Sequence, residues 1–304
     1  MPRRVIMTGA TGYVGGRLAA RLVASGLAVC AVMRAGSDPA RLTGCLPGLA
    51  VASADTPAAL AEAISRFRPE VLLHVAAAGP FPPGPESAQR IVEANIGFAI
   101  AVVEASLAAG CEALVYTGTQ WQHRTGTADY APVDLYAASK QAFHDLMRAY
   151  TDHRGLKAIQ LELCDVYGPS DPRRRIIDLL IEAALSGGPV DLTEGTQEID
   201  PVHVDDVVSA YVAAAASAIT SGTAPAATYS VCGGRPMSVR ALARLVEEVT
   251  GRRIDARWGA RTYAPGSLVR PYIHDRPLPG WSPKVRLEDG IAGMVAAVRQ
   301  GAWA

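Results

Sequence analysis

The chain lacks an excess of either charge, because its 304 residues carry 29 lysines and arginines against 29 aspartates and glutamates. A dedicated nucleic-acid binder needs a basic face and usually a basic excess, so this balance argues against that function. With 49% hydrophobic and 19% charged residues, the composition is that of a folded globular chain and excludes a disordered one.

Long apolar runs are also lacking. The two longest, residues 71–79 and 210–219, are each interrupted by a polar residue and fall short of the ~18–20 residues of a membrane helix. Arg3 and Arg4 are followed by a short apolar stretch, residues 5–7, where a signal peptide needs ~7–15 apolar residues. We therefore expect no membrane association and a cytoplasmic protein.

The five cysteines include no Cys-x-x-Cys pair, and the six histidines show no metal-ligand spacing. We expect no metal site, no zinc ribbon and no redox pair. Cys30, Cys111 and Cys164 stand in or beside apolar runs, which is typical of small core residues. The odd number and wide scatter of the cysteines favour a reducing compartment.

Short apolar segments alternate with longer helical ones from the start of the chain. We expect strands near residues 5–7, 28–33, 50–52, 71–75, 113–116, 158–163 and 228–231. Helices are expected near residues 13–25, 57–67, 89–109, 135–153, 205–217 and 287–299. All-apolar strands separated by helices predict an α/β fold with a doubly wound parallel sheet covered on both faces.

Prolines become frequent after Leu163, and the expected elements become shorter. We assign residues 1–164 and 198–234 to the sheet domain. Residues 165–197 and 235–304 are assigned to a smaller, irregular C-terminal lobe that would bind substrate. The two parts are therefore interleaved in sequence.

A glycine-rich turn, residues 8–15 (TGATGYVG), ends the first strand and opens the first helix. In this context the first glycine permits a tight turn, the second lets the backbone approach a pyrophosphate, and the third lets helix and strand pack closely. The free N–H groups of the helix would bind the phosphates. The alternative is a turn packed for structure alone. The predicted dinucleotide-binding residues here are Gly9, Thr11, Gly12, Tyr13, Val14 and Gly15.

The end of the second strand indicates which dinucleotide is bound. An NAD site usually has Asp or Glu there for the ribose 2′-hydroxyl, whereas this strand ends in Met33 and Arg34. Arg34 can pair with a 2′-phosphate, so NADP(H) is favoured over NAD(H); a surface arginine is the alternative. Asp55, after the third strand, is a candidate for adenine recognition.

A tyrosine and a lysine are spaced i, i+4 in Tyr136-Ala-Ala-Ser-Lys140, so a helix presents both on one face. A phenol is a poor acid–base at neutral pH, and a neighbouring ammonium makes it a tunable proton donor to a carbonyl oxygen. Thr119 follows the strand at 113–116 and places a hydroxyl near the carboxyl edge of the sheet, where ligands bind.

These motifs, in this order, resemble the extended short-chain dehydrogenases/reductases of the nucleotide-sugar epimerase/dehydratase type. Further matching pieces are residues 74–78 (HVAAA), Asn95, 116–119 (YTGT), 166–169 (VYGP) and 201–206 (PVHVDD). The resemblance covers most of the chain and implies a Rossmann-type fold.

The same resemblance implies roles for individual residues. Tyr136 would be the acid–base, Lys140 its activator and ribose anchor, and Thr119 the hydroxyl that orients the substrate oxygen. Ala76 and Ala77, together with Tyr136 and Lys140, would contact the dinucleotide. Asn95 would be structural or support the site through its helix. Such proteins often form homodimers through the helices that carry Asn95 and Tyr136.

Three reactions need separating. A 4,6-dehydratase of this type carries Asp-Glu directly after the active-site threonine, whereas Gln120 and Trp121 stand here and neither is an acid or base. A 4-epimerase holds NAD tightly, and Arg34 argues against it without excluding it. A ketoreductase needs only a hydride from NADPH and a proton from Tyr136. Residues 119–124, 130–136 and 165–173 also resemble a reductase-like subgroup that includes CDP-abequose synthases.

We therefore expect NADPH-dependent reduction of the 4-keto group of a nucleotide-linked 4-keto-6-deoxy or dideoxy hexose. The alternative enzyme is an NAD-dependent nucleotide-sugar 4-epimerase. An alternative of another class is a non-catalytic NADP-binding sensor, and the pair of Tyr136 and Lys140 argues against it.

Substrate contacts are harder to predict. Gln120 and Trp121 are candidates for the sugar pocket. Asp165 stands where many nucleotide-sugar enzymes have an Asn that helps hold the diphosphate, and its charge would repel that group unless paired. Arg173, in the run 173–175, could compensate, although a solvated charge run is the alternative. Arg235 and Arg270 are other candidate clamps, because arginine offers a bidentate fork. His74 and His203 are expected to be structural.

Overall fold

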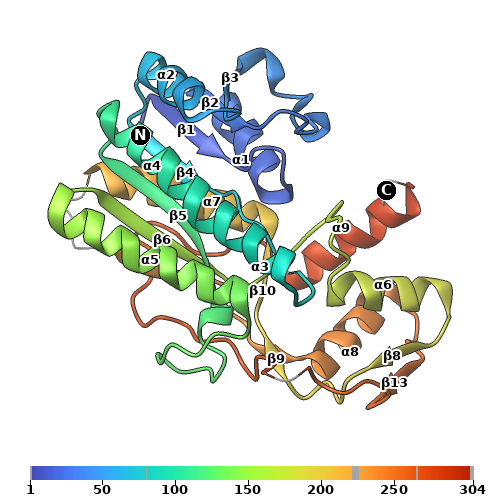
Figure 1. Ribbon diagram of the computed structural model, residues 1–304. Coiled ribbons are helices and arrows are strands. Elements are labelled where there is room, and N and C mark those ends of the chain that lie inside the picture. Colours follow the sequence, from blue (N-terminus) through green and yellow to red (C-terminus); the bar gives the residue numbers. More distant parts are fainter. Residues whose placement is uncertain (1, 80, 221–225, 265, 302–304) are drawn as a thin grey trace.

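The computed structural model describes residues 2–79, 81–220, 226–264 and 266–301. Seven parallel strands form the central sheet, in the order β11-β6-β5-β4-β1-β2-β3 (Figure 1). Their bounds are β1 Arg4–Thr8, β2 Ala28–Met33, β3 Leu49–Ser53, β4 Val71–His74, β5 Ala113–Thr119, β6 Lys157–Leu163 and β11 Ala227–Val231. The predicted fold class and all seven predicted strands of the sheet are confirmed.

Helices cover both faces of this sheet, which explains why the strands are apolar on both sides. On one face, α1 (Tyr13–Ala24) and α7 (Val204–Thr220) pack in one apolar cluster. On the other face, α2 (Pro57–Phe67), α4 (Phe98–Ala108) and α5 (Leu135–Arg154) pack in a second cluster. Short 3-10 turns, η1 Ala40–Leu42 and η2 Leu46–Gly48, connect β2 to β3. The strand order reverses between β1 and β4, and such a reversal opens a crevice for ligands at the carboxyl ends of the strands.

A third apolar cluster belongs to a smaller lobe beyond the carboxyl ends of the strands (Figure 1). Its helices are α6 (Ile176–Ser186), α8 (Val239–Thr250) and α9 (Leu287–Arg299). Outside the central sheet, six short strands form three two-stranded pairs: β7 Asp165–Tyr167 with β10 Pro201–His203, β9 Glu198–Ile199 with β12 Met237–Ser238, and β8 Val190–Leu192 with β13 Ala256–Trp258. The structure adds α6 and α8 to the predicted irregular lobe. The domain boundaries at residues 165, 198 and 235 stay a prediction.

One continuous helical segment runs from Pro85 to Ala108 and contains α3 (Pro85–Val92), a π-helical turn (Glu93–Gly97) and α4. Among the described residues it is the one helix whose length and composition would allow it to cross a membrane, and 33% of its most apolar window is buried. That is weak evidence, because core helices meet the same criterion. Here α4 packs against α2 and buries Ala99, Val102 and Val103.

Cys164 is a buried core residue, as the sequence predicts, but it is bonded to a second cysteine, which the sequence pattern does not predict. Cys164 and Cys232 form a disulfide, with their Cα atoms 5.0 Å apart. They follow the neighbouring strands β6 and β11, whose last residues are paired in register. Sequence spacing hides this pairing because 68 residues separate the two cysteines. Cys30, Cys45 and Cys111 are free and buried. The cysteine pattern therefore no longer supports the predicted reducing compartment and cytoplasmic location. The location stays a prediction.

The disulfide predicts a measurable thiol count and a stability effect. In denatured, unreduced protein we expect three thiols to react with a disulfide-exchange reagent, and five after reduction. Because the bond closes a long loop, Cys232→Ser should lower the free energy of unfolding by about 4 kcal/mol in oxidising buffer. The control is the same comparison in a reducing agent, where the difference should largely disappear. Five reactive thiols before reduction would contradict the bond.

Candidate functional site

The glycine turn brings the N-terminus of α1 against the ends of β1 and β4. Gly9 has φ +73°, and a Cβ built on it would lie 2.6 Å from the backbone nitrogen of Ala76. A Cβ on Gly15 would lie 1.9 Å from the carbonyl oxygen of Gly9. Neither position has room for a side chain, so the helix begins directly at the sheet edge. The turn thus has the close packing that a dinucleotide-binding turn requires.

The first turn of α1 fits a bound phosphate. Its N-cap is Gly12, which offers no side chain to accept hydrogen bonds from the free N–H groups, and the first turn contains no acidic residue. The positive end of the helix dipole and these N–H groups are therefore available to an anion. Arg41, which no sequence motif indicates, donates a 3.4 Å hydrogen bond to the carbonyl of Thr11 and adds positive charge beside the turn.

Tyr13 links the glycine turn to the segment after β7. Its hydroxyl donates to the carbonyl of Pro169 at 3.3 Å, and the guanidinium of Arg17 lies 4.3 Å from its ring centroid. Burial raises its pKa, so it stays protonated. Val14 packs against the adjoining core. The structure therefore gives Tyr13 and Val14 packing contacts within the protein, and their predicted contacts with a dinucleotide stay predictions.

Ala76 and Ala77 follow β4 at the same edge. The backbone N–H of Ala76 donates to Thr8 Oγ1 at 3.2 Å, and Thr8 Oγ1 lies 3.0 Å from His74 Nδ1. Burial, with a smaller effect of the Lys140 charge, lowers the pKa of His74 to about 3, so the ring is neutral. His74 has the structural role that the sequence predicted, and it fixes the turn that places Ala76 beside Gly9.

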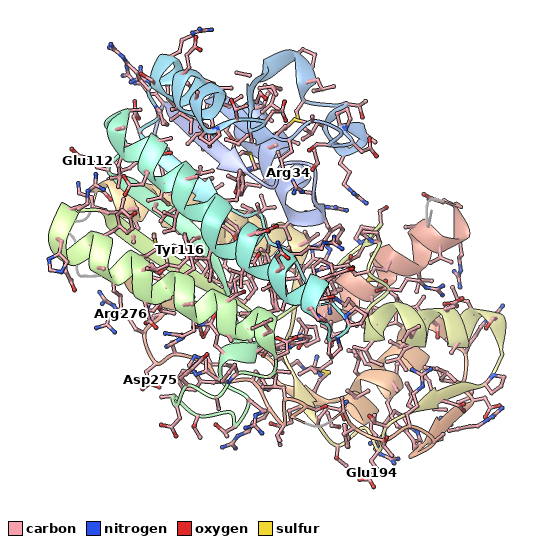
Figure 2. All side chains as sticks on the ribbon, viewed as in Figure 1. Arg34, Glu112, Tyr116, Glu194, Asp275 and Arg276 are labelled. Carbon is pink, nitrogen blue, oxygen red and sulfur yellow. A yellow bond between two sulfur atoms is a disulfide. The ribbon has the colours of Figure 1, made fainter. Side chains whose placement is uncertain are left out.

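Arg34 directly follows β2 (labelled in Figure 2). The carboxylate of Asp55 braces the turn after it, because Oδ1 accepts from the N–H of Ala35 at 2.6 Å and Oδ2 accepts from the Ser53 hydroxyl at 2.7 Å. These hydrogen bonds, that of Ser53 first, lower the pKa of Asp55. Asp55 therefore stays ionised while both of its oxygens have partners within the protein.

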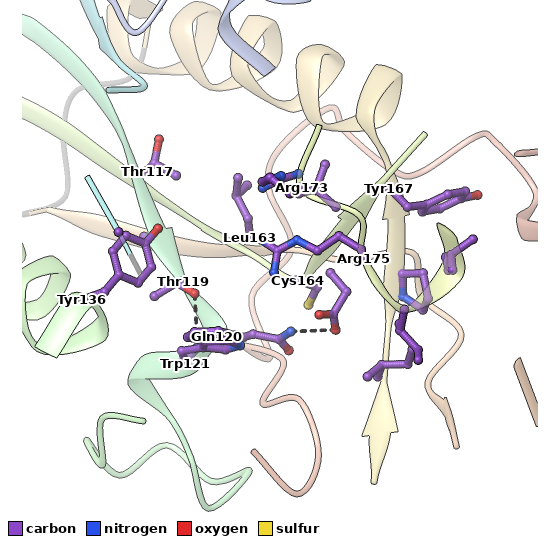
Figure 3. Close-up of a pocket in the computed structure, with 18 residues that line it drawn as sticks. Thr117, Thr119, Gln120, Trp121, Tyr136, Leu163, Cys164, Tyr167, Arg173 and Arg175 are labelled. Atoms are coloured by element: carbon purple, nitrogen blue, oxygen red, sulfur yellow. Dashed lines mark hydrogen bonds between the residues drawn. The ribbon is translucent and has the colours of Figure 1, made fainter. Parts of the chain in front are cut away.

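A pocket of about 610 Å³ lies between the carboxyl ends of the strands and the smaller lobe (Figure 3). It is lined by the end of β5, the start of α5, β7, Arg173 and residues 175–177. Thr119, Gln120, Trp121, Tyr136, Asp165 and Arg173 all line it, so the structure brings six of the predicted site residues together. Arg235 and Arg270 do not line it: Arg235 pairs with Glu288, and Arg270 lies against Gly126.

Thr119 caps the 3-10 turn η4 (Gln120–Gln122) at the end of β5. Its Oγ1 accepts from the backbone N–H of Trp121 at 3.3 Å, and its own N–H donates to Gln122 Oε1 at 3.0 Å. Oγ1 accepts this hydrogen bond and donates none among the described residues, so the hydroxyl proton remains for a ligand. Figure 3 shows Thr119 beside Tyr136, across the pocket from Arg173 and Arg175.

Gln120 holds the carboxylate of Asp165. Its Nε2 donates to Asp165 Oδ2 at 2.9 Å (Figure 3). Burial raises the pKa of Asp165, against the lowering effects of Gln120 and Arg175. Gln120 is 2% exposed, and its Oε1 has no hydrogen-bond partner among the described residues. A buried acceptor without a partner is costly, and a ligand hydroxyl in this pocket would satisfy it.

Tyr136 and Lys140 lie in the first turns of α5, whose N-cap Asp134 accepts from the N–H of Ala137 at 2.8 Å. The amino group of Lys140 is 5.6 Å from the ring centroid of Tyr136. Burial raises the pKa of Tyr136 to about 12, although the charges of Arg175 and Arg173 oppose the shift. Burial lowers the pKa of Lys140 to about 8. The structure thus presents a protonated phenol with a lysine that titrates near neutral pH.

The π-helical turn points Asn95 inward. Its side chain accepts from the N–H of Ala78 at 2.7 Å and donates to Ser139 Oγ at 2.9 Å. Ser139 Oγ in turn donates to the carbonyl of Tyr136 at 2.7 Å. Asn95 therefore connects the end of β4 to the first turn of α5, which is the supporting position that the resemblance implied.

The arginine run 173–175 separates into two environments. Arg174 forms an ion pair with Glu182 on the surface and does not line the pocket. Arg173 lines the pocket and forms a 2.6 Å ion pair with Asp171. Arg175 also lines it, and no ion pair among the described residues includes Arg175. Burial and the charge of Arg173 lower the pKa of Arg175, so an anion in the pocket would be favoured. Arg173 is predicted from the sequence, and the structure adds Arg175.

Known proteins share this fold across nearly the whole chain. The chain is 27% identical to UDP-glucose 4-epimerase of Mycolicibacterium smegmatis over 97% of its own length and 98% of that protein. It is 23% identical to CDP-abequose synthase of Salmonella muenchen, over 97% of both chains. The structure of Thermus thermophilus UDP-glucose 4-epimerase in complex with NAD superposes with a TM-score of 0.80 at 26% identity, over 97% of this chain and 99% of that one.

The model of the NAD dependent epimerase/dehydratase family matches residues 5–230, which include the glycine turn, Thr119 and the pair of Tyr136 and Lys140. The chain therefore belongs to the NAD dependent epimerase/dehydratase family, whose members are NAD(P)-dependent oxidoreductases and epimerases of the short-chain dehydrogenase/reductase kind.

Proposed function

We propose that the protein reduces the 4-keto group of a nucleotide-linked 4-keto-6-deoxy or dideoxy hexose with NADPH. The observation that carries this proposal is Arg34 at the end of β2, where an NAD site would have a carboxylate. Asp55, after the neighbouring strand β3, has both carboxylate oxygens engaged by Ala35 and Ser53. A 2′-phosphate at this position would therefore lie beside a guanidinium, which favours NADPH. NADPH that is not permanently bound acts as a stoichiometric reductant, as the proposed reaction requires.

The pocket residues supply the proton that the reduction requires. When bound at the glycine turn, the reduced nicotinamide supplies a hydride to the carbonyl carbon. Tyr136 donates its proton to the carbonyl oxygen, and the charge of Lys140 stabilises the phenolate that remains. The Thr119 hydroxyl donates to the same oxygen and orients it. A carbonyl, a hydride and a proton together give the alcohol, so no further acid or base is required.

The other pocket groups fit a nucleotide diphosphate sugar. Arg175 is a guanidinium in the pocket wall without an ion pair among the described residues, and a diphosphate is the anion of that substrate. Gln120 Oε1 accepts from a sugar hydroxyl. The ring of Trp121, 6.5 Å from that of Tyr136 and at 90° to it, forms an apolar wall for the hexose.

A second candidate is a nucleotide-sugar 4-epimerase. It is supported by relatives that are UDP-glucose 4-epimerases at 26–27% identity. The same threonine, tyrosine and lysine would serve an oxidation followed by a reduction within one turnover. That reaction consumes no net NADPH, which separates the two candidates experimentally.

We also propose that the protein is a homodimer. Val92 on α3 and Leu135 and Leu146 on α5 are 48%, 46% and 38% exposed, which is unusual for large apolar side chains. The two helices lie side by side on one face of the molecule (Figure 1).

The dimer is tested by light scattering in solution, which should give the mass of two chains. The mass of a single chain would contradict the dimer.

The function is tested with a panel of CDP-, dTDP-, UDP- and GDP-linked 4-keto-6-deoxy hexoses. We expect one class to oxidise NADPH, followed by nicotinamide absorbance, with one alcohol formed per NADPH. Arg34→Asp should lower kcat/KM for NADPH relative to NADH roughly 10–100-fold, because a hydrogen bond to a charged group contributes about 1.5–3 kcal/mol. The matched control is Arg21→Asp, an exposed arginine near the end of α1.

Other outcomes would point elsewhere. Interconversion of a sugar and its 4-epimer by tightly bound NAD, with no net nicotinamide change, would establish the epimerase. An unchanged preference for NADPH in Arg34→Asp would remove the observation that carries the proposal. Binding of NADPH without turnover of any keto sugar would favour the sensor.

The proton donor is tested by Tyr136→Phe, which removes only the hydroxyl. We expect kcat to fall roughly 10²–10⁴-fold, as for the loss of a general acid, with the Kd of NADPH nearly unchanged. Tyr130→Phe, at a tyrosine that is 51% exposed, is the control. Near-normal turnover by the phenylalanine variant would refute this chemistry.

The pH dependence of the wild type tests the role of Lys140. The value of kcat/KM for reduction should fall as the pH rises through about 8, because Lys140 loses its charge there.

Adjacent arginines test the diphosphate contact. Arg175→Ala should raise KM for the nucleotide sugar roughly 10–100-fold, because a charge-assisted hydrogen bond is lost, while kcat changes less. Arg174→Ala removes the same charge from the surface, where Arg174 pairs with Glu182, and should leave KM unchanged. Steady-state kinetics at fixed, saturating NADPH gives both values. Equal effects of the two substitutions would contradict a specific contact by Arg175.

A further inference from the structure

Outside the pocket, two histidines surround a buried glutamate. Glu162 lies on β6, and its side chain is 4% exposed. His123 follows the turn η4, and His274 comes from the loop after β13. Asp275 and Arg276, labelled in Figure 2, mark that loop. Among the described residues, the ion-pair partners of Glu162 are these two histidines.

We propose that His123, Glu162 and His274 bind a divalent transition-metal ion, with Zn²⁺ the best match to two imidazoles and a carboxylate. One atom from each residue lies within 4.8 Å of the other two. His274 Nε2 is 2.8 Å from Glu162 Oε2, and His123 Nε2 is 3.4 Å from the same oxygen. Bonds of ~2.0–2.2 Å in a tetrahedral zinc site place ligand atoms roughly 3.4 Å apart. Small side-chain rotations therefore bring all three onto one ion.

The outer contacts of His123 favour an ion. Its Nδ1 lies 3.2 Å from the carbonyl oxygen of Asp129, so Nδ1 carries the hydrogen and donates it. In a neutral ring, Nε2 then presents its lone pair to the Glu162 carboxylate. Two acceptors facing one another repel unless a proton or a cation lies between them. A ligating histidine whose other nitrogen donates to a backbone carbonyl is the usual arrangement at a metal site.

The surroundings hold both imidazoles in place. The ring of Tyr272 has its centroid 4.8 Å from that of His123 and 4.8 Å from that of His274. The backbone N–H of His274 donates to Ser230 Oγ on β11 at 2.9 Å. The side chain of His274 is 22% exposed, so the cluster can be reached from solvent.

This site is separate from the chemistry of the pocket. Leu163 lines the pocket, and side chains alternate along a strand, so Glu162 points to the opposite face of β6. An ion there contacts no substrate. It would instead connect β6, the C-terminal loop and the turn η4, whose residues Gln120 and Trp121 form a wall of the pocket. Its role is to brace that wall.

The test is metal binding by the full-length protein, without an activity readout. After chelator treatment and dialysis, titration with Zn²⁺ should give one ion per chain by calorimetry. Co²⁺ should give the visible absorption of a tetrahedral site. We expect His274→Ala and Glu162→Gln to lose more than the roughly 10–100-fold in affinity that an outer-shell change costs. His153→Ala, at an exposed histidine on α5, should bind as the wild type does.

Thermal unfolding distinguishes a variant that no longer binds the ion from one that does not fold. Zn²⁺ should raise the Tm of the wild type and of His153→Ala but not that of His274→Ala, whose substitution is on the solvent side of the site. No binding by the wild type would overturn the proposal. Equal affinity in wild type and His274→Ala would also overturn it, since the ion would then lie elsewhere.

Discussion

The contact between Gly15 and the carbonyl of Gly9 is the constraint on which the site depends. A Cβ on Gly15 would lie 1.9 Å from that oxygen, so α1 can begin at the edge of the sheet because both residues are glycine. A larger residue would push the helix away and remove its N–H groups from the crevice between β1 and β4. The position of the glycine turn and of the first turn of α1 therefore depends on this close backbone contact.

The pocket is assembled from segments that are distant in sequence because parallel strands end at one edge. The end of β5 contributes Thr119, α5 contributes Tyr136, and the segment after β7 contributes Arg175. Each is fixed by short-range bonds: a cap at Thr119, a cap at Asp134, and a helix start at Arg175. Local geometry orients each group, and the sheet brings the groups together.

Much of the fold could be predicted because it depends on local pattern. Apolar runs identify the seven strands, and the glycine turn and the Tyr136–Lys140 spacing predict which segments form the candidate site. The disulfide of Cys164 and the cluster of Glu162 could not be predicted, because their partners lie 68 and 112 residues away on other segments. Arg174 and Arg175 are equivalent in sequence, and only the backbone direction at the start of α6 separates a surface ion pair from a pocket group.

Asn95 has a consequence for motion within the protein. One amide joins Ala78, in the segment after β4, to Ser139 in the helix turn that carries Tyr136. The separation between the segment after β4 and the Tyr136 turn of α5 is therefore set by three hydrogen bonds in series. A shift of the helix 85–108 would therefore act on the segment after β4 and on the start of α5 together.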